Sequence, residues 1–203
     1  VVGTRYTATL DGYGTQPTLS PSGDHLVIMQ SFPDGTDRWP VLYDVKADEF
    51  LTTTLPAAAS YFDYAPSGKL AYANYEDDSI SSASSSAPIP SFFSVSDHYA
   101  YGDIGWSPDE TWLVFTARSG GMDAQNIYKV HPDGSGLVQL TSGDSGYNDS
   151  PSWSPDGSQI AYISYDEYNQ PGEMWLMDAD GLNSRSAVTM TKGYVPPAWS
   201  PDG

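Results

Sequence analysis

The residues of this chain that could carry catalytic chemistry do not stand at catalytic spacings. Gly143-Asp144-Ser145-Gly146 has the pattern found around the nucleophile of some serine proteases, but Tyr147 follows where those enzymes have glycine, and no Ala-Ala-His segment precedes it. The Gly-x-Ser-x-Gly elbow is absent, and His25, His98 and His131 lack the spacing of metal ligands. Because cysteine is absent too, the sequence predicts no catalytic residue, no metal site and no cofactor.

Binding chemistry is better represented, by aromatic residues at regular intervals. A tyrosine lies five to eight residues before each of five evenly spaced prolines: Tyr13, Tyr61, Tyr101, Tyr147 and Tyr194. Such tyrosines offer stacking faces and hydroxyls to a peptide or a glycan. The alternative is that each one only packs over the strand that follows, since residues at repeated positions are often structural.

Acidic residues lie among these tyrosines, and they favour a site for a cation or a basic partner. They are Asp11, Asp103, Asp144 and Asp149. The alternative is a solvated acidic surface that keeps the protein soluble. With both alternatives open, the predicted binding residues are the five tyrosines and Asp149.

The charge of the chain excludes some partners. Its 203 residues include 26 Asp and Glu against 8 Lys and Arg, which gives a formal net charge of −18. A nucleic-acid binder needs a basic face to neutralise phosphates, and an anionic membrane surface attracts basic segments. No apolar run approaches the roughly 18 residues of a membrane span. We therefore expect no nucleic-acid partner and no membrane insertion.

One pentapeptide organises the chain. Trp-Ser-Pro-Asp-Gly stands at 153–157 and 199–203, differs at one position at 106–110, and has weaker copies at 64–68 and 19–23. Its prolines are residues 21, 66, 108, 155 and 201, so the spacings are 45, 42, 47 and 46 residues. A period of about 40–50 residues in a chain rich in turn residues is typical of β-propeller blades.

Each period contains the strands that a blade needs. The pentapeptide suits a type I turn, and an apolar run that predicts a strand buried on both faces follows it, at 26–29, 70–72, 112–115 and 160–163. Third strands are predicted at 41–43, 127–130 and 174–177, followed by tight hairpins and more polar outer strands. The second period is irregular, because its third strand would have to come from 80–84. The low-complexity stretch Ser79–Pro90 suits a flexible loop instead.

We therefore predict an all-β fold, a β-propeller of four-stranded antiparallel blades, with about four complete blades and two partial ones. We expect the chain to be part of a longer propeller. The complete blades are predicted at 15–60, 61–101, 102–150 and 151–197, and the partial ones at 1–14 and 198–203.

The repeat resembles the PD40, or TolB-like, β-propeller repeat. The match is close at 151–161 and at 127–141, whereas the Gly-His and Trp-Asp signatures of the WD40 repeat are missing. The resemblance implies a propeller of about six to eight blades. Such repeats occur in periplasmic TolB, in the amino-terminal propeller of prolyl-oligopeptidase-like serine peptidases and in many bacterial surface proteins. An extracytoplasmic protein, whether periplasmic, secreted or on the cell surface, is therefore expected.

In such a blade, the loops between strands two and three share one rim with the blade-to-blade connections; we call this the loop rim. The Ser-Pro-Asp-Gly turns and the hairpins between strands three and four form the opposite turn rim. The variable loops, with the tyrosines, predict binding on the loop rim. Our first hypothesis is a non-catalytic propeller that holds a peptide, protein or glycan there.

Two alternatives remain open at this point. One is the gating propeller of a prolyl-oligopeptidase-like serine peptidase whose catalytic domain lies outside this chain. The other is a structural subunit of a filament or surface assembly, which would self-assemble through unpaired blade edges. Covalent sugar is a further possibility, on Asn148 in the sequon Asn148-Asp149-Ser150 and on the serine-rich stretch 79–90.

Overall fold

The computed structural model describes residues 17–31, 38–51, 55–74, 76, 78–84, 87–94, 98–119, 124–142, 146–166, 172–189 and 196–203. All regular elements in these ranges are β-strands. None of the described residues forms a helix with the length and apolar character needed to cross a membrane. Of the predicted binding residues, Tyr13 and Tyr194 lie outside the described ranges.

The strands form four successive antiparallel groups, each in the order of the chain. The first sheet contains β1 (Thr18–Leu19), β2 (His25–Ser31), β3 (Arg38–Asp44) and β4 (Glu49–Leu51). The second contains β5 (Ala59–Tyr64), β6 (Lys69–Asn74), β7 (Ser79–Ser84) and β8 (Ala87–Ser94). The third contains β9 (His98–Trp106), β10 (Leu113–Ser119), β11 (Gln125–Val130) and β12 (Val138–Gln139). The fourth contains β13 (Tyr147–Trp153), β14 (Gln159–Tyr165), β15 (Glu173–Asp178) and β16 (Arg185–Thr189).

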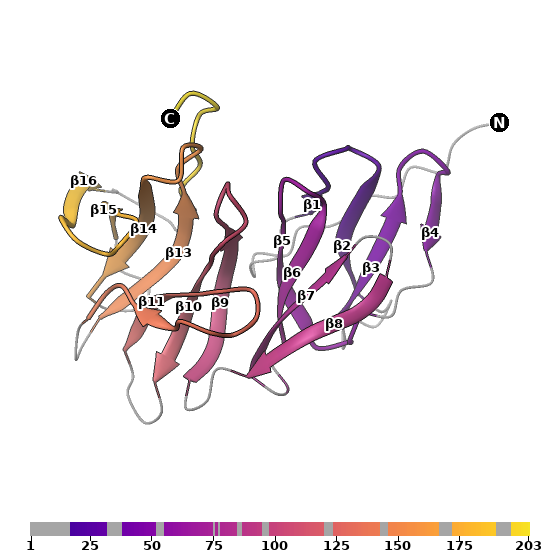
Figure 1. Ribbon diagram of the computed structural model, residues 1–203, viewed down its shortest axis with the longest axis horizontal. Coiled ribbons are helices and arrows are strands. Elements are labelled where there is room, and N and C mark those ends of the chain that lie inside the picture. The colour runs from indigo at the N-terminus through magenta and orange to yellow at the C-terminus, as the bar shows by residue number, and fades with distance from the viewer. Residues whose placement is uncertain are drawn as a thin grey trace.

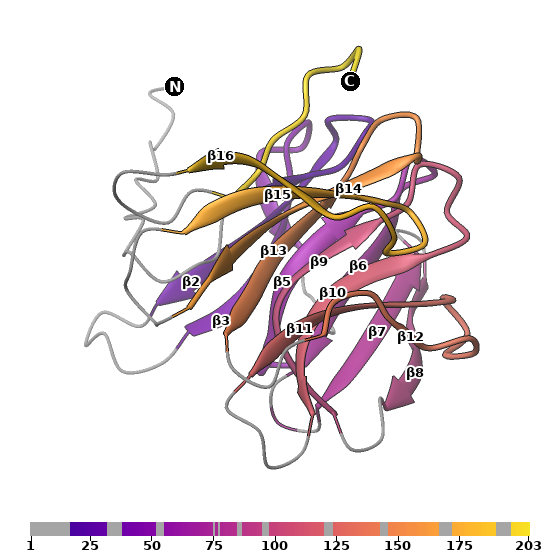
Figure 2. The ribbon, with the colours of Figure 1, turned by 90° about the vertical axis from the view of Figure 1, so that its left-hand side faces the viewer.

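The four sheets lie one beside the next in chain order, with β4 and β16 toward the two ends of the molecule (Figure 1). In the view turned by 90°, the sheets overlap behind β14, β15 and β16 (Figure 2). Their first strands are neighbours in space, because β1 contacts β5, β5 contacts β9 and β9 contacts β13. A parallel bridge between Gln125 and Tyr147 also joins the third and fourth sheets. The predicted fold class is confirmed: the chain is an all-β propeller of four-stranded antiparallel blades, and the described sheets do not close into a ring.

Strands β5, β9 and β13 begin two to four residues before the blade limits predicted at 61, 102 and 151. The first residues of these strands, such as Ala59-Ser60 and Tyr147-Asn148-Asp149, form no continuous apolar run, so that hydrophobic patterning does not mark where each strand begins. The limits themselves remain a prediction.

The repeated pentapeptide forms the turn between the first two strands of a blade. In the fourth sheet the Gly157 N–H donates to the Ser154 carbonyl at 2.9 Å, and the Ser154 hydroxyl donates to Asp156 Oδ1 at 2.7 Å. Gly157 has a φ of 71°, in the left-handed region where a side chain is strained. Because proline and glycine each occupy the turn position that suits them, the pentapeptide reverses the chain at each repeat.

The serine-rich stretch of the second period forms strands. Ser79–Ser84 is β7 and Ala87–Ser94 is β8, so the alternative of a flexible loop is wrong for these residues. Ile80 is fully buried in a core cluster, and the flanking Ser79 and Ser81 are 3% and 0% exposed. Burial of one isoleucine between small side chains gives this segment a strand context that its composition does not reveal.

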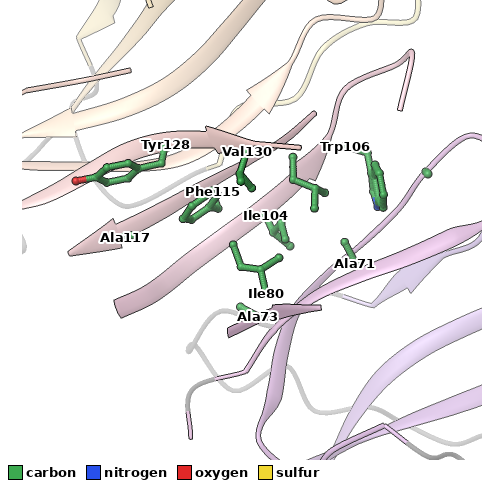
Figure 3. Packing of buried hydrophobic residues seen from close by; sticks show 11 residues of the cluster. Ala71, Ala73, Ile80, Ile104, Trp106, Phe115, Ala117, Tyr128 and Val130 are labelled. Carbon is green, nitrogen blue, oxygen red and sulfur yellow. The ribbon is translucent and has the colours of Figure 1, made fainter. Parts of the chain in front are cut away.

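The core lies between the sheets. Figure 3 shows Ala73 and Ile80 of the second sheet facing Ile104 and Phe115 of the third. In β10 the alternate residue Val114 belongs instead to the cluster between the third and fourth sheets. Leu113, Val114 and Phe115 are all 0% exposed, as expected for a second strand with a neighbour on both faces. The outer strand β16, by contrast, is exposed throughout.

Candidate functional site

The two predicted tyrosines with described side chains occupy different places in their blades. Tyr147 begins β13 on the loop rim, and its ring stacks on Tyr165 with centroids 5.3 Å apart and an interplanar angle of 14°. Tyr61 lies within β5 at a register shift, has a φ of 52° and packs against the core cluster between the second and third sheets. Tyr101 lies in β9. Tyr147 is thus the rim tyrosine, and Tyr61 packs between blades.

The difference follows from the distance to the repeated proline. Tyr61 lies five residues before Pro66, and Ser150 lies five residues before Pro155, each with a φ of 52° at a bulge in a first strand. Tyr147 lies eight residues before Pro155, at the start of its strand. The range of five to eight residues before the proline, by which the tyrosines are grouped, therefore includes two different positions within a first strand. The binding role of the tyrosines remains a prediction.

Polar contacts support the base of Tyr147. The Gln125 N–H donates to the Gly146 carbonyl at 3.2 Å, next to the bridge between β11 and β13. The Asn148 amide nitrogen donates to the Gln125 carbonyl and to Asn126 Oδ1, each at 3.4 Å. These contacts hold the rim residues of the third and fourth sheets together. They also engage the nitrogen that a glycan would modify, and glycosylation of Asn148 remains a prediction.

The structure brings two of the predicted acidic residues together. Asp149 Oδ1 accepts hydrogen bonds from the Ser150 N–H at 2.8 Å and from Thr116 Oγ1 at 3.0 Å. The Ser150 hydroxyl donates to Asp103 Oδ2 on the neighbouring first strand. A Cβ on Gly102 would lie 2.9 Å from Asp149 Oδ1, so a side chain there would press on Asp149. Asp149 thus has contacts typical of a structural carboxylate. Asp11 and Asp144 lie outside the described residues.

A third carboxyl group, which the sequence did not single out, lies in a hollow between β5, β9 and β13. Asp63 Oδ2 accepts a hydrogen bond from the Trp106 N–H at 2.7 Å, and burial raises the pKa of Asp63 to about 6. The hollow has a volume of about 240 Å³ and is also lined by Ile104 and Ser152. The equivalent positions, three residues before the repeated proline, are Gly105 and Ser152 in the next two blades. The carboxyl group at a position where the next two blades have glycine and serine was the sequence signal that could have identified Asp63.

The described residues contain no group of three or more His, Cys, Asp or Glu that could hold a metal ion. The carboxylates of Asp103, Asp149 and Asp63 each accept hydrogen bonds within the protein. A catalytic carboxyl group or nucleophile would need a partner aimed at a shared reaction point.

Comparison with known proteins finds sequence similarity over about half of the chain or less for the three relatives that follow. No family model matches it. It is 36% identical over 109 residues, or 48% of this chain, to an uncharacterised protein of Agrobacterium fabrum. It is 30% identical over 105 residues, or 50% of this chain, to an uncharacterised peptidase of Bacillus subtilis. It is 34% identical over 87 residues, or 43% of this chain, to the Tol-Pal system protein TolB of Rhizorhabdus wittichii. The matched parts span 36%, 16% and 18% of those three proteins.

Solved structures agree with the fold. A TolB structure from Acinetobacter baumannii has a TM-score of 0.71 at 17% identity and covers 92% of this chain and 46% of its own. A TolB-type structure from Agrobacterium tumefaciens has a TM-score of 0.70 at 23% identity and covers 91% of this chain and 69% of its own. At these identities the likeness shows a common propeller architecture.

Proposed function

Because the chain is a β-propeller of TolB-like repeats, we propose that it is a non-catalytic binding propeller that works outside the cytoplasm. It holds a peptide, protein or glycan on its loop rim, and a protein partner is favoured. The observation that carries this proposal is the 34% identity to a Tol-Pal system protein across the repeats. In a rigid propeller the loops are the parts free to vary, which makes a rim the natural place for recognition.

Tyr147 is the residue on which we place this function. It stands on the loop rim with its ring stacked on Tyr165, and the Gln125–Gly146 contact fixes the backbone beside it. Two parallel aromatic rings held on a rigid edge form a preorganised surface, which lowers the entropy that binding must overcome. The rings also supply hydroxyl groups for orientation.

Site-specific cross-linking tests this proposal. A photoreactive phenylalanine analogue is placed at Tyr147 and, as the control on the turn rim, at Asp133, and each variant is expressed in the source organism. We expect a protein adduct from position 147 that is absent from position 133. The adducted partner is then purified, and Tyr147→Ala should weaken its binding about tenfold or more. Adducts from position 133 alone, or unchanged affinity with a lowered melting temperature, would support a packing role for Tyr147.

A second candidate is the gating propeller of a serine peptidase. The similarity to the Bacillus subtilis peptidase, at 30% identity over 50% of this chain, favours it. In that case the catalytic domain would be encoded outside these residues. Sequencing of the whole reading frame tests the idea. A hydrolase domain beside the propeller would establish it, and a frame with no such domain would end it.

A further inference from the structure

A groove opens on the turn rim, on the side opposite to the proposed binding residues. It lies between the third and fourth sheets, has a volume of about 390 Å³ and is lined mainly by Asp109, Trp112, Lys129, Trp153, Asp156 and Ala179. Small-molecule sites have volumes of about 300–1,000 Å³, so the groove is large enough for a small ligand. Because two blades contribute its walls, the groove depends on the packing of one blade against the next.

Two carboxylates of the groove are fixed by their own turns. Asp109 Oδ1 accepts hydrogen bonds from the Ser107 hydroxyl at 2.6 Å and from the Thr111 N–H at 3.1 Å. Asp156 Oδ1 accepts them from the Ser154 hydroxyl at 2.7 Å and from the Ser158 N–H at 3.0 Å. These bonds lower the pKa of both groups, that of Asp156 to about 2. Both stay ionised at physiological pH.

The outer oxygen of each carboxylate retains acceptor capacity. Asp109 Oδ2 is near the Thr111 hydroxyl and Asp156 Oδ2 is near the Ser158 hydroxyl, each at 2.9 Å. The same hydroxyl also lies near Oδ1 of its carboxylate, and it has one proton to donate. The two Oδ2 atoms can therefore accept hydrogen bonds from a ligand.

Lys129 supplies donors at a fixed position. Its ammonium donates to the Ala179 carbonyl of the fourth sheet at 2.7 Å and lies 4.5 Å from the ring centroid of Trp112. Trp112 in turn stacks on His131, with centroids 3.7 Å apart. An ammonium has three N–H groups, so donors remain for a ligand after the Ala179 contact.

The charges of the groove select the class of ligand. The groove carries the ammonium of Lys129 beside the carboxylates of Asp109 and Asp156, so no simple ion is complementary to all three groups. A neutral polyol fits both kinds of group, because its hydroxyls donate to the carboxylates and accept from the ammonium, while its C–H groups lie against the indoles. We propose that this groove binds neutral carbohydrate, in the form of one or two hexopyranose units of a glycan. The site is separate from the loop rim.

Titration with three neutral trisaccharides tests the proposal, with maltotriose, cellotriose and triacetylchitotriose as probes. Saturation-transfer NMR and tryptophan fluorescence report on binding to the whole chain. We expect saturable binding of at least one probe with a dissociation constant on the order of 1 mM. Lys129→Met keeps the aliphatic stem and removes the donors, and it should weaken binding about tenfold or more. Ala179→Trp fills the groove and should abolish binding.

The matched variants are Asp156→Asn and Asp133→Asn. Asp133 accepts hydrogen bonds from the Ser135 N–H at 2.9 Å and from the Ser135 hydroxyl at 2.7 Å, in the same local geometry as Asp156, but it does not line the groove. Asp156→Asn should weaken carbohydrate binding, whereas Asp133→Asn should leave it unchanged. No saturable binding of any probe overturns the proposal, as does equal binding by wild type and Ala179→Trp. Binding of an Arg-Gly repeat peptide that Asp156→Asn abolishes, without carbohydrate binding, also overturns it.

Discussion

Two neighbouring blade interfaces, built from the same repeat, differ in how they are held on the turn rim. Between the second and third sheets, Glu110 accepts hydrogen bonds from the Ser67 N–H at 2.5 Å, the Ser67 hydroxyl at 2.7 Å and Lys69 at 3.1 Å. Asp63 adds a bond across the same interface to the Trp106 N–H. We call this the carboxylate-bridged interface.

The interface between the third and fourth sheets, called the grooved interface, has glycine at both equivalent positions. Gly157 replaces Glu110 two residues after the repeated proline, and Gly105 replaces Asp63 three residues before it. A Cβ on Gly157 would contact Pro108 at an ordinary 3.6 Å, so it would meet no steric clash there. Two positions of the repeat therefore distinguish the interface with the polar bridge from the grooved one.

We expect the largest effect from a substitution in the apolar core, Phe115→Ala. It tests whether the core, rather than the polar bridge, stabilises the carboxylate-bridged interface. Phe115 is 0% exposed in the cluster between the second and third sheets. Phe115→Ala should lower the free energy of unfolding by about 3–5 kcal/mol, because it removes buried area and leaves a cavity. Urea denaturation measures this loss. The adjacent Val114→Ala, on the other face of β10, is the control for the grooved interface and should cost less. A Phe115→Ala loss no greater than that of Glu110→Ala would contradict this ranking.

The second effect concerns the buried carboxyl of the carboxylate-bridged interface. Burial raises the pKa of Asp63 from 3.8 to about 6, so the folded state binds a proton more tightly than the unfolded state. The stability that this proton contributes is complete below the unfolded pKa and is lost as pH rises through the folded pKa. Asp63→Asn keeps an acceptor for the Trp106 N–H and removes the charge. It should therefore raise the free energy of unfolding at neutral pH, by up to about 3 kcal/mol at roughly 1.4 kcal/mol per pKa unit.

Denaturation of wild type and Asp63→Asn as a function of pH checks this prediction. The difference between the two proteins should be small below the unfolded pKa of Asp63, and it should grow until pH passes the folded value near 6. Asp103→Asn is a useful comparison, because Asp103 is a partly buried carboxylate of the next first strand that accepts a bond from Ser150. A difference independent of pH would show that Asp63 titrates normally.

The third effect isolates Glu110, which combines favourable contacts with a strained backbone. Burial acts to raise the pKa of Glu110, but the bonds from Ser67 and Lys69 lower it below its usual value. The φ of Glu110 is 59°, in the left-handed region. Glu110→Ala removes the bonds and keeps the strain, so it should cost about 1–2 kcal/mol, in line with charged hydrogen bonds at a partly exposed site. Glu110→Gly removes both and should cost less, by about 1 kcal/mol. Thermal unfolding of the pair measures the difference, and equal losses would mean that the relief of strain does not exceed the unfolded-state entropy that glycine adds.

How much the sequence predicts follows from the range over which each signal acts. The turns are local, since proline and glycine set the backbone of a few residues, and the buried second strands follow from continuous apolar runs. The strand β7 is not local: Ile80 makes it a strand by packing against Phe115 of the next sheet. The Glu110–Ser67 contact joins residues 43 positions apart and depends on how two blades meet. Its only sequence signal is the missing glycine after Pro108-Asp109.

The smallest expected effect is that of transferring the polar bridge to the grooved interface. Gly157→Glu alone should fail, because the residue that it faces is Asp109, whereas Glu110 faces the equivalent Ser67. Like charges at close range are destabilising, and the left-handed φ of Gly157 adds strain. Asp109→Ser restores the partner type of the carboxylate-bridged interface. A double-mutant cycle should then show a favourable coupling of about 0.5–1 kcal/mol between Gly157→Glu and Asp109→Ser. The grooved interface has Thr111 at the position of Lys69, so the transferred bridge would lack the lysine contact. A coupling as large as the effect of Glu110→Ala would therefore mean that Lys69 contributes little to the natural bridge.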